Sequence, residues 1–213
     1  MKFFITLIIS FLVTTVVPAQ VKLDVVISPQ INESLGARLG SNLNIPINSR
    51  WSFMPGVYWS LRNRLGTESS TYNGIKKETE YSDHAHFVTL PLRLGLQMPC
   101  KDEDRLAIKL FFGPYIAYGI CGTSKSTVNT GGLETKYEVG AFDSNGRYKD
   151  RLDYGLNYGL NILINQHYTV GIFNEFGFRK IYNTNNVIED IVGEIFLINK
   201  INFALGLSLG YQF

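Results

Sequence analysis

Large apolar residues alternate with small or polar residues along most of this chain. The clearest case is the stretch "INFALGLSLGYQF", residues 201–213, in which every odd position is large and apolar and every even position is small or polar. A period of two is typical of a β-strand whose two faces meet different surroundings. The central question is which surroundings the apolar face meets: a protein interior or lipid.

The alternation recurs eight times and predicts eight strands. These are expected at residues 21–28, 35–45, 50–62, 88–98, 106–120, 152–162, 168–179 and 201–213. Short turns are expected at 29–33, 46–49, 99–104 and 165–166, and long polar loops at 63–83, 121–151 and about 180–196. Antiparallel neighbours place the last three short turns at one end and the long loops at the other, which is the pattern of outer-membrane barrels.

Two orientations of the strands are possible. In a soluble, lipocalin-like barrel the apolar face points inward, but roughly forty large side chains exceed what an eight-stranded lumen holds. Its wet exterior would also carry many glycines within strands, where glycine normally marks close packing. In the opposite orientation Gly, Ala, Ser and Asn fill the lumen and the apolar face meets hydrocarbon. We therefore expect an all-β, eight-stranded, antiparallel up-and-down transmembrane β-barrel, closed because lipid satisfies no open strand edge.

Aromatic residues fall where the two interfacial girdles of such a barrel should lie. They are Trp51, Tyr168, Tyr211 and Phe213 near the short turns, and Trp59, Tyr118, Tyr154 and Phe178 near the long loops. No Lys, Arg, Asp or Glu takes a lipid-facing position within the predicted strands. Five residues fit the pattern poorly, and bulges or shifted register are expected at each of them. They are Ser41, Asn174, Pro55, Pro91 and Pro114.

The N-terminus has the order of a secretory signal peptide. Lys2 precedes an apolar run that ends at Val17, and cleavage is expected after Ala19. The alternative, a membrane-anchor helix, is disfavoured because the run is shorter than the roughly 20 residues of a bilayer span. No cysteine follows the run where a lipid anchor would need one. The remaining chain, 20–213, is expected to form one outer-membrane β-barrel domain.

Charge and cysteine content narrow the function classes. Removing residues 1–19, which contain one of the 20 basic residues, leaves 19 against 18 acidic ones. Such a balance gives no electrostatic reason to expect a nucleic-acid partner. Cys100 and Cys121 bracket one predicted strand and would lie roughly 60 Å apart along it, too far for a disulfide.

The strand patterns resemble the eight-stranded outer-membrane β-barrel family common in the Bacteroidetes, which includes barrels of the PorT type. The similarity rests on "FVTLPLRLGLQ", "KLFFGPYIAYGI", "LDYGLNYGLNILINQHYTVGIFNEFGFRKIYN" and "FALGLSLGYQF". The resemblance implies residence in outer-membrane lipid and insertion by the barrel assembly machinery, which reads a C-terminal aromatic strand. It places individual function in the long loops, above all 121–151. An envelope or secretion partner would bind through 63–83, 121–151 and 180–196.

Charged residues collect on the face expected to line the lumen. The cations are Lys22, Arg38, Arg50, Arg62, Arg93, Lys109 and Arg179, and the acids are Asp24, Asp153 and Glu175. One interpretation is an anion-attracting channel or pocket. The preferred one is a salt-bridged plug, because eight strands leave little room for a continuous pore.

The motif "YSDHAHF", residues 81–87, is the main candidate for chemistry. Ser82, Asp83, His84 and His86 lie near the outer rim, where a catalytic or metal site is conceivable. No third ligand stands at telling spacing, so ordinary rim residues are the preferred interpretation.

Two further motifs are interpreted as turns. "TGG" at 130–132 and "DSNG" at 143–146 lack the ending and the context of a phosphate loop. We expect "DSNG" to form the tip of a hairpin that extends beyond the membrane. His167, beside the 165–166 turn, is interpreted as a solvated residue.

The sequence therefore predicts a non-enzymatic barrel with no catalytic, cofactor-binding or metal-ligating residue. Its expected role is structural, adhesive or accessory to envelope transport or secretion. The alternatives are a narrow pore for small solutes and an outer-membrane lipid-modifying enzyme.

Overall fold

The computed structural model describes residues 21–32, 34–72, 75–99, 105–144, 146, 148–180 and 201–213. The predicted signal peptide, the 100–104 part of one turn and the predicted loop beyond Lys180 lie outside these residues. Within the described part of the chain, no helix is long and apolar enough to cross a bilayer.

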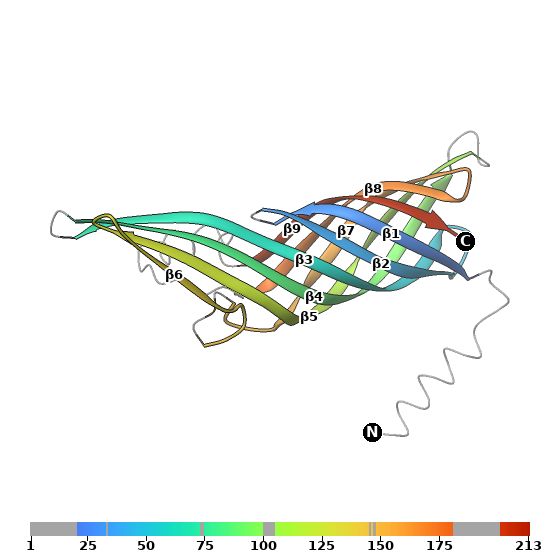
Figure 1. The fold of residues 1–213 in the computed structure, drawn as a ribbon. Coiled ribbons are helices and arrows are strands. Elements are labelled where there is room, and N and C mark those ends of the chain that lie inside the picture. The colour runs from blue at the N-terminus through green and yellow to red at the C-terminus, as the bar shows by residue number, and fades with distance from the viewer. Residues whose placement is uncertain are drawn as a thin grey trace, which may run out of the picture.

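Eight antiparallel strands close into a ring, which confirms the predicted barrel (Figure 1). The ring order is β1 (Lys22–Ile31), β2 (Leu35–Pro46), β3 (Trp51–Tyr72), β4 (Ile75–Pro99), β5 (Leu106–Thr130), β7 (Leu152–Ile164), β8 (Tyr168–Lys180) and β9 (Ile201–Gln212). The first and last strands pair to complete it, with Val25 opposite Tyr211. The backbone N–H of Phe213 also donates to the Leu23 carbonyl at 2.9 Å.

The apolar face of the ring points outward. Ile27, Phe112 and Leu207 keep 57%, 56% and 59% of their surface exposed, whereas Ser28 on the opposite face of β1 keeps 1%. Such an exposed belt suits hydrocarbon, because soluble proteins rarely leave large apolar patches in water. The soluble-barrel alternative, which needs the apolar face inside, is therefore wrong.

Three strands continue well beyond the ring. β3, β4 and β5 have 22, 25 and 25 residues, whereas the other strands of the ring have 10 to 13. A ninth strand, β6 (Leu133–Gly140), pairs with β5 outside the ring. We call this four-stranded projection, made of residues 63–72, 75–84, 123–130 and β6, the outer sheet (Figure 1).

The outer sheet corrects two predicted loops. Residues 63–72, residues 75–83 and the first part of 121–151 form strands. Beyond Arg64 and Asp83 both faces of these segments are largely exposed, and most of their residues are polar at odd and even positions alike. Without an apolar face, the alternation that marks a strand is missing from the sequence.

Two of the predicted turns are confirmed here, and the predicted tip of one hairpin is wrong. Asn165 and Gln166 form a two-residue turn with φ of 50° and 60°, and Gly131 and Gly132 of "TGG" form another with φ of 57° and 92°. The tip of the β5–β6 hairpin is therefore "TGG" and not "DSNG". Asp143 instead forms a turn after β6, where its carboxylate accepts the Gly140 N–H at 3.0 Å.

The expected bulges are also absent from the positions named for them. Pairing keeps one register through Ser41, Pro55, Pro91, Pro114 and Asn174. Pro29, assigned to a turn, lies within β1 opposite Ala37. The prolines are accommodated without an extra residue, so the strands keep their faces.

The register shifts elsewhere. In the β4–β5 pair His86 lies opposite Cys121 and Phe87 opposite Gly119, so Ile120 is the extra residue. Ile120 and Cys121 are both exposed. A second shift lies between Phe176 and Lys180 in the β8–β9 pair. The first shift occurs where β5 leaves the ring and joins the outer sheet.

Candidate functional site

The centre of the lumen holds a network of buried ion pairs. Arg62 of β3 contacts Asp153 of β7 at 3.1 Å and Glu175 of β8 at 3.3 Å. Arg38 of β2 contacts Glu175 at 2.8 Å, and the Tyr115 hydroxyl donates to Asp153 at 2.9 Å. None of the four charged side chains is more than 2% exposed. These contacts join strands from different parts of the ring across its lumen.

A second cluster surrounds Arg93 of β4. Its guanidinium donates to Asn42, to the Tyr58 hydroxyl at 3.2 Å and to Asn157 at 3.4 Å. The Tyr58 hydroxyl in turn donates to Asn42 at 2.6 Å. Arg93 is 4% exposed. In these contacts the N–H groups of its buried guanidinium donate to amide and phenol oxygens rather than to a carboxylate.

Aromatic rings share the lumen with these arginines. The Arg38 guanidinium carbon lies 3.7 Å from the Tyr58 ring centroid, that of Arg62 lies 4.2 Å from Phe87, and that of Arg93 lies 4.8 Å from Phe111. Such cation–π contacts contribute about 2 kcal/mol when desolvated. The expectation that only small residues fill the lumen was therefore incomplete.

Glycines on neighbouring strands make room for these rings. A Cβ at Gly40 would overlap the ring of Tyr58, and one at Gly159 would overlap the ring of Phe111. The glycine-rich inward face therefore marks slots for aromatic side chains from adjacent strands.

The outer mouth of the barrel is closed by the segment after β6. The described residues 141–144, 146 and 148, which we call the mouth plug, place Phe142 and Tyr148 against Phe87, with ring centroids 5.6 and 5.8 Å away. The Arg151 guanidinium lies 4.8 Å from the Phe142 ring and donates to the Ile120 carbonyl at 2.9 Å. A Cβ at Gly119 would overlap the Phe142 ring, so this glycine is needed for closure.

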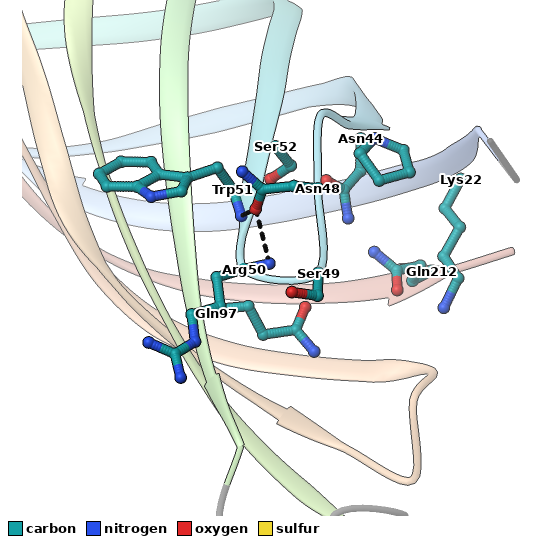
Figure 2. A pocket seen from close by; sticks show the side chains of 10 residues that line it. Lys22, Asn44, Asn48, Ser49, Arg50, Trp51, Ser52, Gln97 and Gln212 are labelled. Atoms are coloured by element: carbon teal, nitrogen blue, oxygen red, sulfur yellow. Dashed lines mark hydrogen bonds between the residues drawn. The ribbon is translucent and has the colours of Figure 1, made fainter. Parts of the chain in front are cut away.

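The end of the barrel with short turns opens into a polar vestibule (Figure 2). Two cavities of about 160 and 170 Å³ share Lys22 and Gln97 as lining residues. Arg50 lines the first cavity and Arg105 the second. Gln212, which also lines the first cavity, donates to Asp24 at 2.6 Å, and Lys109 is 3% exposed.

Most of the predicted lumen charges lie in the ion-pair network, in the Arg93 cluster or in the vestibule. Arg38, Arg62, Arg93, Lys109, Asp24, Asp153 and Glu175 are buried in the lumen. Lys22 and Arg50 line the vestibule, and Arg179 pairs with Asp150 at 3.1 Å. The contacts of the buried set fit the salt-bridged plug rather than an open channel.

Sequence reasoning missed the continuation of this face into the outer sheet. Arg64 and Asp83 lie opposite each other in the β3–β4 pair and are 9% and 0% exposed. From the sequence, Asp83 is expected among the exposed residues of the rim. The sequence does hold a signal for this continuation. The alternation that turns Arg62 of β3 inward also turns Arg64 inward, beyond the predicted end of the strand.

The rim motif divides between the two faces of β4. Asp83 and Ala85 are fully buried on the inner face, whereas Ser82, His84 and His86 alternate with them on the outer face. Ser82 Oγ lies 3.2 Å from His84 Nε2, and His84 Nδ1 lies 2.9 Å from Asn63 Oδ1. Asn63 is thus a member of this cluster that the sequence did not identify.

His86 and His167 are packed against aromatic rings. The His86 ring stacks on Trp59 with centroids 5.4 Å apart, and that of His167 stacks on Tyr211 at 5.5 Å. His167 is exposed but is therefore held at the girdle and not merely solvated. Among the described residues, no group of three or more His, Cys, Asp or Glu is placed to hold a metal ion. Cys121 is exposed and unbridged, and Cys100 lies outside the description.

Comparison with known proteins identifies several barrels of similar extent. The N-terminal β-barrel domain of Pseudomonas aeruginosa OprF is 8% identical, with 92% of this chain and 99% of that chain covered and a TM-score of 0.40. Neisserial surface protein A is 10% identical, with 90% and 94% covered and a TM-score of 0.35. Ail, the attachment invasion locus protein of Yersinia pestis, is 9% identical, with 91% and 96% covered and a TM-score of 0.30.

No curated protein matches the chain significantly. A family model described as "Outer membrane protein beta-barrel domain" matches residues 7–183, well over half of the sequence. With its closed ring and outward apolar belt, the chain belongs to this family of bacterial outer-membrane β-barrel proteins.

Proposed function

We propose that this protein is a non-conducting barrel that anchors the outer sheet as a recognition surface, in an adhesive, structural or transport-accessory role. The filled lumen is the observation that carries the proposal. Arg62 has no exposed side-chain surface at the centre of the lumen, and Phe142 and Tyr148 close the outer mouth. Nothing else in the molecule projects as far from the barrel as the outer sheet (Figure 1) among the residues described.

The surface of the outer sheet supports recognition rather than membrane insertion. Leu133, Lys136 and Tyr137 of β6 are exposed, Leu133 by 77% and Tyr137 by 57%. Lys125 pairs with Glu138 at 3.3 Å across the β5–β6 pair. An exposed tyrosine such as Tyr137 is a residue type that is enriched in protein-binding surfaces.

Several narrower statements belong to the same proposal. Export would be followed by cleavage after Ala19, and the barrel assembly machinery would insert the chain. The strand and glycine patterns support kinship with PorT-type barrels of the Bacteroidetes. An envelope or secretion partner would bind through 63–83, 121–151 and 180–196. Mass spectrometry of the N-terminus of the outer-membrane protein tests the cleavage.

Conductance in planar lipid bilayers tests the closed lumen. The purified protein should give no discrete single-channel steps, because paired charges and aromatic rings occupy the lumen. Discrete, reproducible conductance would instead support the narrow pore. The variant Phe142→Ala serves as a matched test, since it opens only the mouth and should remain silent.

Shortened hairpins test the recognition surface. Replacing 65–82 and 124–139 by Asn-Gly turns retains the Arg64–Asp83 and Thr123–Gly140 pairs. The ring should still form and should still shift its gel mobility on heating. Attachment of expressing cells to one another or to mucin-coated surfaces should fall to the level of cells without the protein. Unchanged attachment, where the full-length protein promotes it, would refute the recognition role.

A further inference from the structure

Three side chains on the outer face of the rim form a directed chain of hydrogen bonds. Ser82 and His84 lie two residues apart on β4, and Asn63 lies opposite His84 on β3. The Ser82 Oγ to His84 Nε2 distance is 3.2 Å and the His84 Nδ1 to Asn63 Oδ1 distance is 2.9 Å. A hydroxyl, an imidazole and an orienting group in this order are the arrangement that activates a serine nucleophile.

The donor and acceptor roles in this chain follow from its far end. Asn63 Nδ2 donates to the Leu35 backbone carbonyl at 2.7 Å, which fixes the amide so that Oδ1 faces His84. Because Oδ1 only accepts, His84 Nδ1 must carry the proton. His84 Nε2 then has its lone pair directed toward the Ser82 hydroxyl. The neutral imidazole is therefore held in the tautomer that a general base requires.

The position of the cluster indicates the class of substrate. His86, the next outward residue of β4, stacks on Trp59, which belongs to the outer aromatic girdle and is 40% exposed. Ser82 lies two outward positions beyond His86, roughly 13 Å further along β4, so it stands at the water-side edge of the membrane interface. Acyl esters of outer-leaflet lipids are among the hydrolysable bonds near this edge.

A cation lies on the same face beside the serine. Lys125 of β5 is the register partner of Ser82, and directly opposed residues have Cβ atoms about 5 Å apart. Its ammonium pairs with Glu138 at 3.3 Å and is 57% exposed, so it is accessible to a bound lipid. A lysine in this position can stabilise the negative charge that develops on a carbonyl oxygen during attack.

We propose that Ser82, His84, Asn63 and Lys125 form an esterase site for acyl esters of the outer leaflet. Ser82 Oγ attacks the ester carbonyl while His84 Nε2 takes the hydroxyl proton. The C–O bond to the alcohol then breaks, and the alcohol leaves with that proton. Water attacks the acyl-serine with His84 again as base, which releases the fatty acid and restores Ser82. Ser82 and His84 are the catalytic residues, and Asn63 is a positioning residue.

This site extends the sequence-based candidate, and the expectation of a non-enzymatic barrel stays a prediction that the tests below decide. It is independent of the recognition role, because the ring and the outer sheet stand whether or not Ser82 reacts. Failure of the tests below leaves the proposed function untouched.

The first experiment labels the serine directly. The full-length protein, purified from outer membranes in detergent, is treated with a fluorophosphonate probe and then digested for mass spectrometry. Label is expected on Ser82, and Ser82→Ala and His84→Ala should both lose it. Ser69→Ala is the matched control, because Ser69 is also exposed on the extended part of β3. Each variant must retain its heat-dependent gel shift, which shows a folded barrel.

The second experiment measures hydrolysis of p-nitrophenyl butyrate and of diacyl phospholipid in mixed micelles. His84→Ala should reduce kcat by about a hundredfold or more, since a positioned base typically contributes that much. Asn63→Ala should lower kcat with little change in KM, and Asn63→Asp should restore it. Lys125→Ala should lower kcat with the phospholipid about tenfold or more.

Two results would overturn the proposal. One is a folded protein that neither reacts with the probe at Ser82 nor hydrolyses either ester. The other is hydrolysis that persists unchanged in Ser82→Ala, which would assign the activity to another group.

Discussion

The ring and the outer sheet share three strands, yet the two regions follow different rules. Leu207 in the ring and Leu65 in the outer sheet are almost equally exposed, at 59% and 57%. The first contacts lipid and the second contacts water. In the ring, residues alternate because one face meets hydrocarbon and the other a packed lumen. The outer sheet lacks that contrast, so its pairing depends on polar cross-strand contacts.

The largest difference between the two regions should appear when one partner of an ion pair is removed. Arg62→Ala removes the cation that contacts both Asp153 and Glu175, although Arg38 still contacts Glu175, and should lower the free energy of unfolding by about 3 to 5 kcal/mol. The matched control is Lys136→Ala, because Lys136 pairs with Glu134 at 3.0 Å but is 77% exposed. That change should cost less than about 1 kcal/mol. Urea unfolding in lipid vesicles measures both, and equal losses would contradict the comparison.

A charge on the outward face should be the next largest effect. Leu207→Arg places a cation against hydrocarbon and should cost about 2 to 4 kcal/mol, depending on its depth. Leu65→Arg, at nearly the same exposure, should change stability by less than about 0.5 kcal/mol. The same unfolding assay compares the two variants. If Leu207→Arg proved harmless, the lipid belt would be misplaced.

Filling the space that Gly119 leaves for the mouth plug should have a smaller effect on the free energy of unfolding. Gly119→Val forces the Phe142 ring away and should cost about 1 to 3 kcal/mol, as overpacking usually does. The displaced plug should also expose Arg151 to trypsin. Cleavage after Arg151, followed by mass spectrometry, should be faster in the variant than in the parent protein. Unchanged cleavage would show that the plug does not depend on this glycine.

The smallest effect on the ring is expected from the tip of the outer sheet. Gly132 has φ of 92° and open space around its Cα, so Gly132→Val strains only the local backbone. The strain amounts to about 1 to 2 kcal/mol within the hairpin. Protease should cut the β5–β6 tip more readily, while the urea midpoint of the barrel stays the same. A shifted midpoint would mean that the two regions unfold together.

The sequence predicts the ring because lipid and lumen impose opposite demands on adjacent residues. The parity that exposes Leu207 also places Arg38, Arg62 and Glu175 in the lumen. Which cation meets which acid is not predictable in the same way. Those pairs lie on different strands, and their distances depend on the curvature of the closed ring.

The outer sheet and the rim escaped prediction for different reasons. The segment "KKETEYS", residues 76–82, is polar throughout, so no period distinguishes it from a loop. Without the extra residue at Ile120, the alternation along β5 would turn Cys121 inward. With the extra residue, Gly122 points inward instead. Asn63 lies 21 residues from His84, and only the register of β3 against β4 brings them together.

The seam between β1 and β9 has a consequence for biogenesis. The partners of β1 on that side come from residues 205–213, and Gln212 contacts Asp24 across 188 positions of sequence. The first strand therefore keeps half of its backbone groups unmatched until β9 has been made. Hydrocarbon offers these groups no substitute partner, so β1 cannot rest in the bilayer before β9 arrives. A chain cut before Ile201 would carry an open strand edge that no bilayer can accept.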